Sequence, residues 1–269
     1  MPKKIIFMGT PLFAVPILKS LYQNGFPISV VYTQPPQKSH RGQKINKSPI
    51  QGIAETLNID FRSPESLMNN VDEFNFLKEL QADLAIVVAY GQKIPKNFLD
   101  LTKKGFINIH GSILPKFRGA APIQRSIMNL ENETGISIMK INEELDSGPV
   151  SNIYKIKLSR EDNAEEISEK LSNLAAEKIL ENVDEILDGK SKFIDQDHSK
   201  ATYAKKIEKL EGEINWSDKP IKTIAKINGL FPMPGAFFKF DGERYKILKA
   251  EIGNGIGKIG EVISDKLEI

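Results

Sequence analysis

Apolar runs of strand length alternate with apolar positions at helical spacing along the first half of the chain. One helical segment begins with a Ser-Pro pair, an N-cap followed by proline at the first helical position. Repeated strand–helix units of this kind predict an α/β protein with a Rossmann-like, mostly parallel sheet and flanking helices. The expected strands are residues 4–8, 28–32, 84–89 and 105–110, and the expected helices are 13–21, 48–57 and 71–80.

The pattern changes after Thr134. Residues 136–141 alternate between apolar and polar side chains, and a similar stretch follows at 153–158. Both predict strands added to one side of the sheet. Residues 164–187 then have the spacing of one long amphipathic helix that ends near Gly189.

The rest of the chain divides into a connection and a smaller β-rich part. The connection is polar and non-periodic, as is typical of a linker. Beyond it, an Asp-Gly pair marks a hairpin turn among short strands expected at 237–240, 245–250 and 260–263. The predicted boundaries are 1–189 for the first domain, 190–204 for the linker and 205–269 for the second domain.

Composition narrows the class of protein only modestly. The chain has 269 residues, and it contains no cysteine, so disulfides and thiolate metal sites are excluded. A net charge of +2 is too small to indicate nucleic-acid binding by itself. No apolar run is long enough to span a bilayer, and residues 1–11 fit a first strand better than a signal peptide. We expect a cytoplasmic monomer with no membrane partner.

The most informative chemistry lies where the strand at 105–110 ends. Asn108 and His110 point to the same face of that strand. Open α/β sheets bind ligands beyond the carboxyl ends of their strands, so an amide and an imidazole are presented together at a crevice. Asp146 follows a later strand and could orient or charge the imidazole. A lone histidine is more often structural, but these two companions favour a catalytic role.

These residues resemble a known constellation. Asn108, His110 and Asp146 match the catalytic triad of the folate-dependent formyltransferases. The loop Ser112, Ile113, Leu114 and Pro115 resembles the Ser-Leu-Leu-Pro loop of that superfamily, with isoleucine replacing the first leucine at similar volume. The resemblance extends over nearly the whole chain and is closest to the methionyl-tRNA formyltransferase family. The further matching segments are 7–14, 81–91, 118–125 and 231–236.

The resemblance implies an activity and its participants. The formyl group of 10-formyltetrahydrofolate would move to the amino group of methionyl initiator tRNA for translation initiation. Asn108 would bond the formyl oxygen, and His110 would stabilise the oxyanion with help from the charge of Asp146. The resemblance suggests Asp146 as proton acceptor, although the residues alone leave this open. The four loop residues at 112–115 would contact the folate, and the reaction needs no metal.

The resemblance also implies a tRNA-binding element. The connection between residues 34 and 49 is long for a strand-to-helix loop and carries several basic residues. Composition alone would favour a solvated loop. In the family, a basic loop at this position enters the tRNA acceptor stem, so Arg41 is the expected recognition residue and Lys44 a weaker candidate. The second domain resembles an OB-like barrel, but about three strands are expected where a complete barrel has five, so it is expected to be incomplete.

Three alternative functions share parts of this pattern. A folate-dependent N-formyltransferase acting on an amino sugar nucleotide or on glycinamide ribonucleotide would use the same triad, but the basic loop and the second domain favour tRNA. A formyl-folate hydrolase commonly carries an N-terminal regulatory domain, whereas here the catalytic type of domain begins at Met1. A non-catalytic tRNA-binding protein would not need the triad.

Overall fold

The computed structural model describes residues 3–38, 45–265 and 268–269. A seven-stranded sheet organises the first part of the chain, with the order β5-β2-β1-β6-β7-β8-β9. The first five strands in this order are parallel to one another, whereas β8 is antiparallel to β7 and β9 is antiparallel to β8. The predicted α/β class and the strands added at one side are therefore confirmed. The bounds are β1 Ile5–Gly9, β2 Ile28–Tyr32, β5 Phe61–Arg62, β6 Leu84–Val88, β7 Phe106–His110, β8 Glu133–Lys140 and β9 Val150–Lys157.

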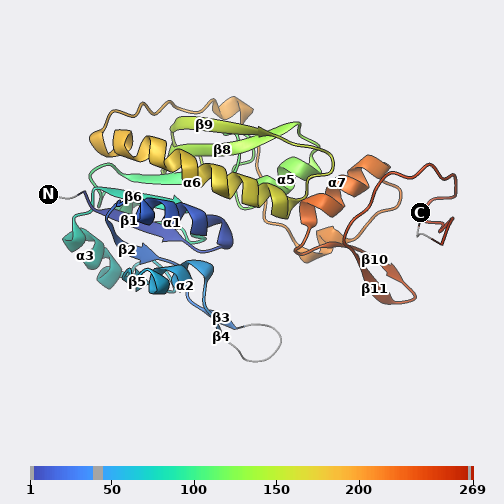
Figure 1. Cartoon of the computed structure of the whole chain (residues 1–269), viewed down its shortest axis with the longest axis horizontal. Coiled ribbons are helices and arrows are strands. Elements are labelled where there is room, and N and C mark those ends of the chain that lie inside the picture. The colour runs from blue at the N-terminus through green and yellow to red at the C-terminus, as the bar shows by residue number, and fades with distance from the viewer. Residues whose placement is uncertain (1–2, 39–44, 266–267) are drawn as a thin grey trace.

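Helices cover both faces of this sheet. Alternate residues of β1 divide between two apolar clusters, because successive side chains of a strand point to opposite faces. Ile5 and Phe7 pack with α1 and α6, whereas Ile6 and Met8 pack with α3 and α4. In Figure 1, α6 runs across the sheet beside α1. The helices are α1 Val15–Gln23, α2 Pro49–Thr56, α3 Val71–Leu80, α4 Lys96–Leu99, α5 Pro122–Met128, α6 Ala164–Asp188 and α7 Pro220–Leu230.

Local sequence signals set the ends of these helices. The Ser48 side chain accepts a hydrogen bond from the Gln51 amide at the start of α2. Asn163 and Glu166 form a reciprocal capping box at the start of α6, which ends in left-handed Gly189. These signals explain why both helices begin and end close to their predicted positions. No helix within the described residues is long and apolar enough to cross a membrane.

The end of the chain forms a small second sheet. β10 Ala236–Phe240 and β11 Glu243–Ile247 pair as a hairpin through a turn at Asp241 and Gly242, as predicted. The strand expected at 260–263 is wrong, because these described residues have no strand conformation and no strand partner among the described residues. Their surroundings are rich in glycine, and large side chains there are exposed, so no buried face fixes a strand register.

The C-terminal part packs on the first part mainly through α5 and α7 (Figure 1). Gly229 lies so close to α5 that an added Cβ would stand 2.6 Å from Cγ of Met128. Arg125 of α5 forms a two-pronged ion pair with Glu211, with its shorter contact at 2.6 Å. A close helix contact and a partly buried ion pair therefore join the two parts.

Candidate active site

The strand β7 carries two of the predicted site residues at the carboxyl edge of the sheet. It lies between parallel β6 and antiparallel β8, so hydrogen bonds on both sides fix its backbone. Asn108 is partly buried, and the His110 side chain is only 6% exposed. The central position of β7 therefore holds both side chains in place at the end of the strand.

The structure brings Asp146 to these two residues. Its carboxylate oxygen Oδ1 lies 3.4 Å from Nδ2 of Asn108, and Oδ2 lies 3.6 Å from Nδ1 of His110. The backbone amide of Gly119 donates a 2.8 Å hydrogen bond to Oδ2. The predicted convergence of an amide, an imidazole and a carboxylate is therefore present, although the catalytic roles remain a prediction.

The histidine ring has one nitrogen engaged and one facing the carboxylate. Nε2 lies 2.9 Å from the backbone oxygen of Phe117. A carbonyl oxygen can only accept a hydrogen bond, so Nε2 carries a hydrogen in this arrangement. Nδ1 faces Asp146 at a distance too long for a strong hydrogen bond. Catalytic hydrogen bonds are often this long before substrate binds.

The loop at residues 112–115 is held by the neighbouring strand. Ser137 of β8 donates from its hydroxyl to the backbone oxygen of Ser112 at 2.7 Å and accepts from the backbone amide of Leu114 at 3.1 Å. The Ser112 hydroxyl in turn donates to the backbone oxygen of Lys116 at 2.6 Å. The Ser112 side chain is thus used to shape the loop. Ser112 and Leu114 are buried, while Ile113 and Pro115 are partly exposed.

The polar segment at 190–204 lies against this site. Ile194 exchanges two backbone hydrogen bonds of 2.8 and 2.9 Å with Val150 of β9. Further along, backbone bonds of 2.8 and 2.7 Å join Arg118 to Thr202 and Ala204. We call residues 193–204 the strap. These contacts were not predicted from the sequence, because the strap has no periodic pattern of apolar residues. The domain boundaries at 1–189, 190–204 and 205–269 stay a prediction.

The predicted tRNA-binding residues Arg41 and Lys44 lie outside the described residues. The described flanks, β3 Gln37–Lys38 and β4 Ile45–Asn46, pair in antiparallel fashion. This short strand pair lies beyond α2 in Figure 1.

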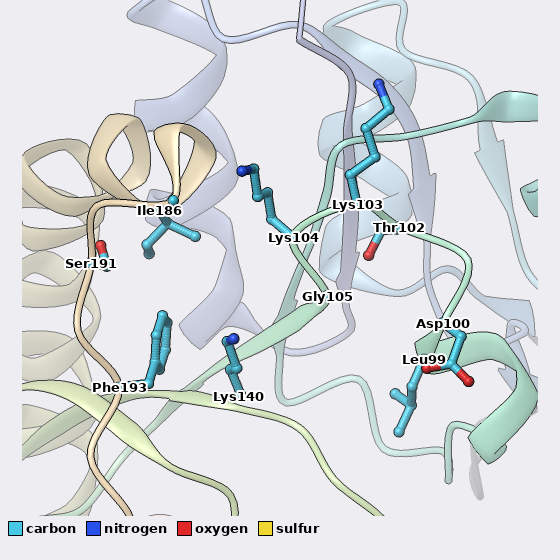
Figure 2. Close-up of a pocket in the computed structure, with 11 residues that line it drawn as sticks. Leu99, Asp100, Thr102, Lys103, Lys104, Gly105, Lys140, Ile186, Ser191 and Phe193 are labelled. Carbon is cyan, nitrogen blue, oxygen red and sulfur yellow. The ribbon is translucent and has the colours of Figure 1, made fainter.

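A polar hollow lies at the opposite edge of the sheet (Figure 2). Its lining includes Thr102, Lys104 and Lys140, and the Lys140 ammonium lies 4.8 Å from the ring centroid of Phe193. Gly105, which also lines the hollow, immediately precedes β7, whereas His110 is the last residue of that strand. None of the described candidate site residues lines this hollow.

A second polar network joins β2, β5 and α3, with Tyr32 and Glu73 buried and Arg62 partly exposed. The Tyr32 hydroxyl donates to Glu73 at 2.5 Å, and Arg62 donates to both oxygens of the same carboxylate at 2.7 and 2.8 Å. Burial raises the pKa of Tyr32, and the hydrogen bond to Glu73 raises the pKa of Arg62. Arg62 also stacks 4.2 Å above the ring of Phe76. These groups satisfy one another, as expected of a structural network.

Comparison with known proteins first defines the class. Residues 3–183 match the family described as Formyl transferase, and residues 206–268 match Formyl transferase, C-terminal domain. The fold is also similar to an N-formyltransferase from Helicobacter canadensis, solved with folinic acid and dTDP-3-aminofucose. That match has a TM-score of 0.72 and 20% identity, and it covers 95% of this chain and 89% of that chain. The fold is thus that of the formyl transferases.

Relatives that match most of the chain then identify the particular family. The methionyl-tRNA formyltransferase of Pelagibacter ubique (strain HTCC1062) is 67% identical over 269 residues, covering 100% of this chain and 87% of the relative. The enzyme of the same name from Dictyoglomus thermophilum is 43% identical over 247 residues, covering 92% of this chain and 79% of the relative. The chain belongs to the methionyl-tRNA formyltransferase family.

Proposed function

We propose that this chain transfers the formyl group of 10-formyltetrahydrofolate to the amino group of methionine on initiator tRNA. The reaction would serve translation initiation in the cytoplasm. The observation that carries the proposal is the convergence of Asn108, His110 and Asp146 at the carboxyl edge of the sheet. The names of the full-length relatives support tRNA as the acceptor.

The three side chains are suited to acyl transfer. The folate supplies a formyl carbonyl whose oxygen gains negative charge when the methionine amine attacks its carbon. Asn108 donates from Nδ2 to that oxygen, and His110 adds a second donor through Nδ1, the ring nitrogen that Phe117 leaves free of its contact. A ring that donates from both nitrogens carries a hydrogen on each, and the carboxylate of Asp146 faces it. Asp146 accepts the proton that the amine loses. When the tetrahedral intermediate collapses, the bond from the formyl carbon to the folate nitrogen breaks, and that nitrogen takes the proton.

The chemistry of the donor set fits a neutral carbonyl better than a phosphate. An amide and an imidazole can both donate to one oxygen, and the carboxylate of Asp146 beside them would repel a phosphate. The loop of Ser112, Ile113, Leu114 and Pro115 adjoins β7 and would hold the folate beside the triad. Its partly exposed apolar residues can pack on the ligand, while Ser137 holds the loop from behind.

The tRNA would be positioned by the segment between β3 and β4 in the sequence, which contains Arg41 and Lys44. Both residues are basic, and phosphate neutralisation by such side chains supplies much of the affinity for nucleic acid. Arg41 is the main recognition residue of this proposal and Lys44 a weaker one. The two-stranded OB-like end of the chain would support the same substrate.

A direct assay separates this function from its main rival, formyl transfer to an amino sugar nucleotide. The chain is given 10-formyltetrahydrofolate together with either methionyl initiator tRNA or dTDP-3-aminofucose, and formylated product is measured. We expect turnover with the tRNA and none with the sugar nucleotide. Turnover with the sugar nucleotide alone would replace the proposed acceptor, and folate hydrolysis without an acceptor would indicate a hydrolase.

A further inference from the structure

Gln196 of the strap is a buried amide whose hydrogen-bonding groups are all used. Its Nε2 donates to the backbone oxygens of Asp146 at 2.9 Å and Gly148 at 2.7 Å. Its Oε1 accepts from Nε of Arg118 at 3.1 Å and from Nη2 at 2.8 Å. A glutamine side chain has two N–H donors and one oxygen with two lone pairs, so this set is complete. The side chain has one orientation that satisfies these partners.

Arg118 fixes that orientation. It is only 2% exposed, and among the described residues its guanidinium contacts Gln196 and Nδ1 of His198 but no carboxylate. A guanidinium can only donate, so the Gln196 oxygen must face Arg118 and the amide nitrogen must face the turn at Asp146. A buried cation held by neutral acceptors is an uncommon arrangement, and here it forces the amide in one direction.

The turn that Gln196 binds needs support. Asp146 has φ of +47°, in the left-handed region that residues other than glycine seldom adopt. At Gly148 an added Cβ would lie 2.0 Å from the backbone oxygen of Lys140, so the turn is packed tightly on the end of β8. One amide therefore holds the backbone carbonyls on both sides of Ser147. The carboxylate of Asp146 extends from this held backbone toward β7.

We infer that Gln196, oriented by Arg118, is a positioning residue that sets the place of the Asp146 carboxylate, an inference that rests on the proposed function of the triad. Gln196 bonds the backbone oxygens of the turn, so it acts on the Asp146 carboxylate through the backbone. Because the Gly119 amide bonds Asp146 Oδ2 at 2.8 Å, that amide reports directly on the carboxylate's position. The Ala204 amide, which bonds the backbone oxygen of Arg118 at 2.7 Å, reports instead on whether the strap stays attached.

Two substitutions separate positioning from a merely structural role. Gln196→Leu removes every hydrogen bond of the Gln196 side chain and keeps a side chain of similar volume. Gln196→Glu keeps an acceptor for Arg118 but, when ionised, cannot donate to the carbonyls of Asp146 and Gly148. Asp195→Asn is the matched control, because Asp195 is the exposed neighbour on the same strap. Formyl transfer to methionyl initiator tRNA and amide hydrogen exchange are measured for all four proteins.

We expect kcat to fall about 10–100-fold in both Gln196 variants, as a small displacement of a catalytic group does, with KM for folate and tRNA within about threefold. Exchange at the Gly119 amide should quicken at least about tenfold while Ala204 stays protected. Asp195→Asn should match the wild type. Wild-type turnover in Gln196→Glu, or a rise in KM for tRNA alone, would overturn the inference.

The exchange measurement keeps the two proposals distinguishable. If the wild-type protein formylates no tRNA, the proposed function fails, but the exchange at Gly119 still tests whether Gln196 holds the carboxylate. If Gly119 and Ala204 lose protection together in both Gln196 variants, Gln196 only attaches the strap and the positioning inference fails. If only Gly119 loses protection, the inference stands.

Discussion

Two largely buried polar networks beside the same sheet differ in how completely they are hydrogen-bonded. The Glu73 carboxylate accepts three hydrogen bonds within 2.8 Å, one from Tyr32 and two from Arg62, so it is nearly saturated. Asp146 has one short bond, from Gly119, and longer separations of 3.4 and 3.6 Å to the amide and the imidazole. The first network has little capacity left for a ligand, whereas the second keeps donors available.

The difference separates a structural role from a chemical one. A saturated buried network stabilises the fold, and removing one member leaves another without its partner. An incompletely bonded group at the end of a strand adds less to stability but can bind a transition state. We therefore expect substitutions in the two networks to have opposite effects on stability and on turnover.

The largest expected effect is loss of turnover in the triad. His110→Ala should lower kcat about 10²–10³-fold, the usual consequence of removing one oxyanion donor. Asn108→Ala and Asp146→Ala should also lower it strongly. Single-turnover formyl transfer and thermal unfolding check this together. Near-wild-type turnover in all three variants would refute the site.

Gly119→Ala tests the short bond that distinguishes Asp146. Gly119 has φ of +116°, and an added Cβ would lie 2.8 Å from the backbone oxygen of Ala204. The backbone must shift, so we expect kcat to fall about 10–100-fold because the carboxylate is displaced. Gly25→Ala is the control, since Gly25 also has positive φ but no atom within 4 Å of the added Cβ. Equal turnover in the two variants would contradict the role of this amide.

Glu73→Gln should show the opposite behaviour. The substitution weakens the bonds to Arg62 and Tyr32 in a buried setting, so we expect a loss of about 1–3 kcal/mol in the free energy of unfolding. Denaturant unfolding measures this loss. Turnover per folded molecule should stay within about twofold, since Glu73 is remote from the acyl-transfer steps. A selective fall in kcat without a loss of stability would place this network in the chemistry.

An exposed ion pair should have the smallest effect. Lys155 and Glu133 lie on neighbouring strands 2.7 Å apart, with side chains 53% and 49% exposed. Such pairs contribute about 0–1 kcal/mol, so Lys155→Ala should change the unfolding free energy by less than about 1 kcal/mol. Kinetics should be unchanged. A larger loss of unfolding free energy would show that the exposure of an ion pair does not predict how much it stabilises this protein.

Sequence patterns foretold the sheet better than the short helices. Strands whose residues are all buried, such as β1 and β6, are continuous apolar runs, and α3 begins and ends as expected. The helix α7 was missed, although proline at its first position and apolar residues at helical spacing marked it. The expected strand at 260–263 failed because alternation alone supplies no partner strand.

The sequence predicted only part of the candidate site, because only some of its residues are placed by a local pattern. Asn108 and His110 share one strand, so their common face follows from period two. Asp146 was placed by its position after β8 and by resemblance. Gln196 was not foreseen, because its bonds to Arg118 and to the turn span 78 and 50 residues and depend on where the strap packs.

The most direct test of the site is a crystal structure with an inert 10-formylfolate analogue. We predict that the formyl oxygen lies within about 3 Å of Asn108 Nδ2 and beside the His110 ring, with the folate along residues 112–115. A folate bound elsewhere, such as the hollow that contains Lys104 and Lys140 (Figure 2), would contradict it.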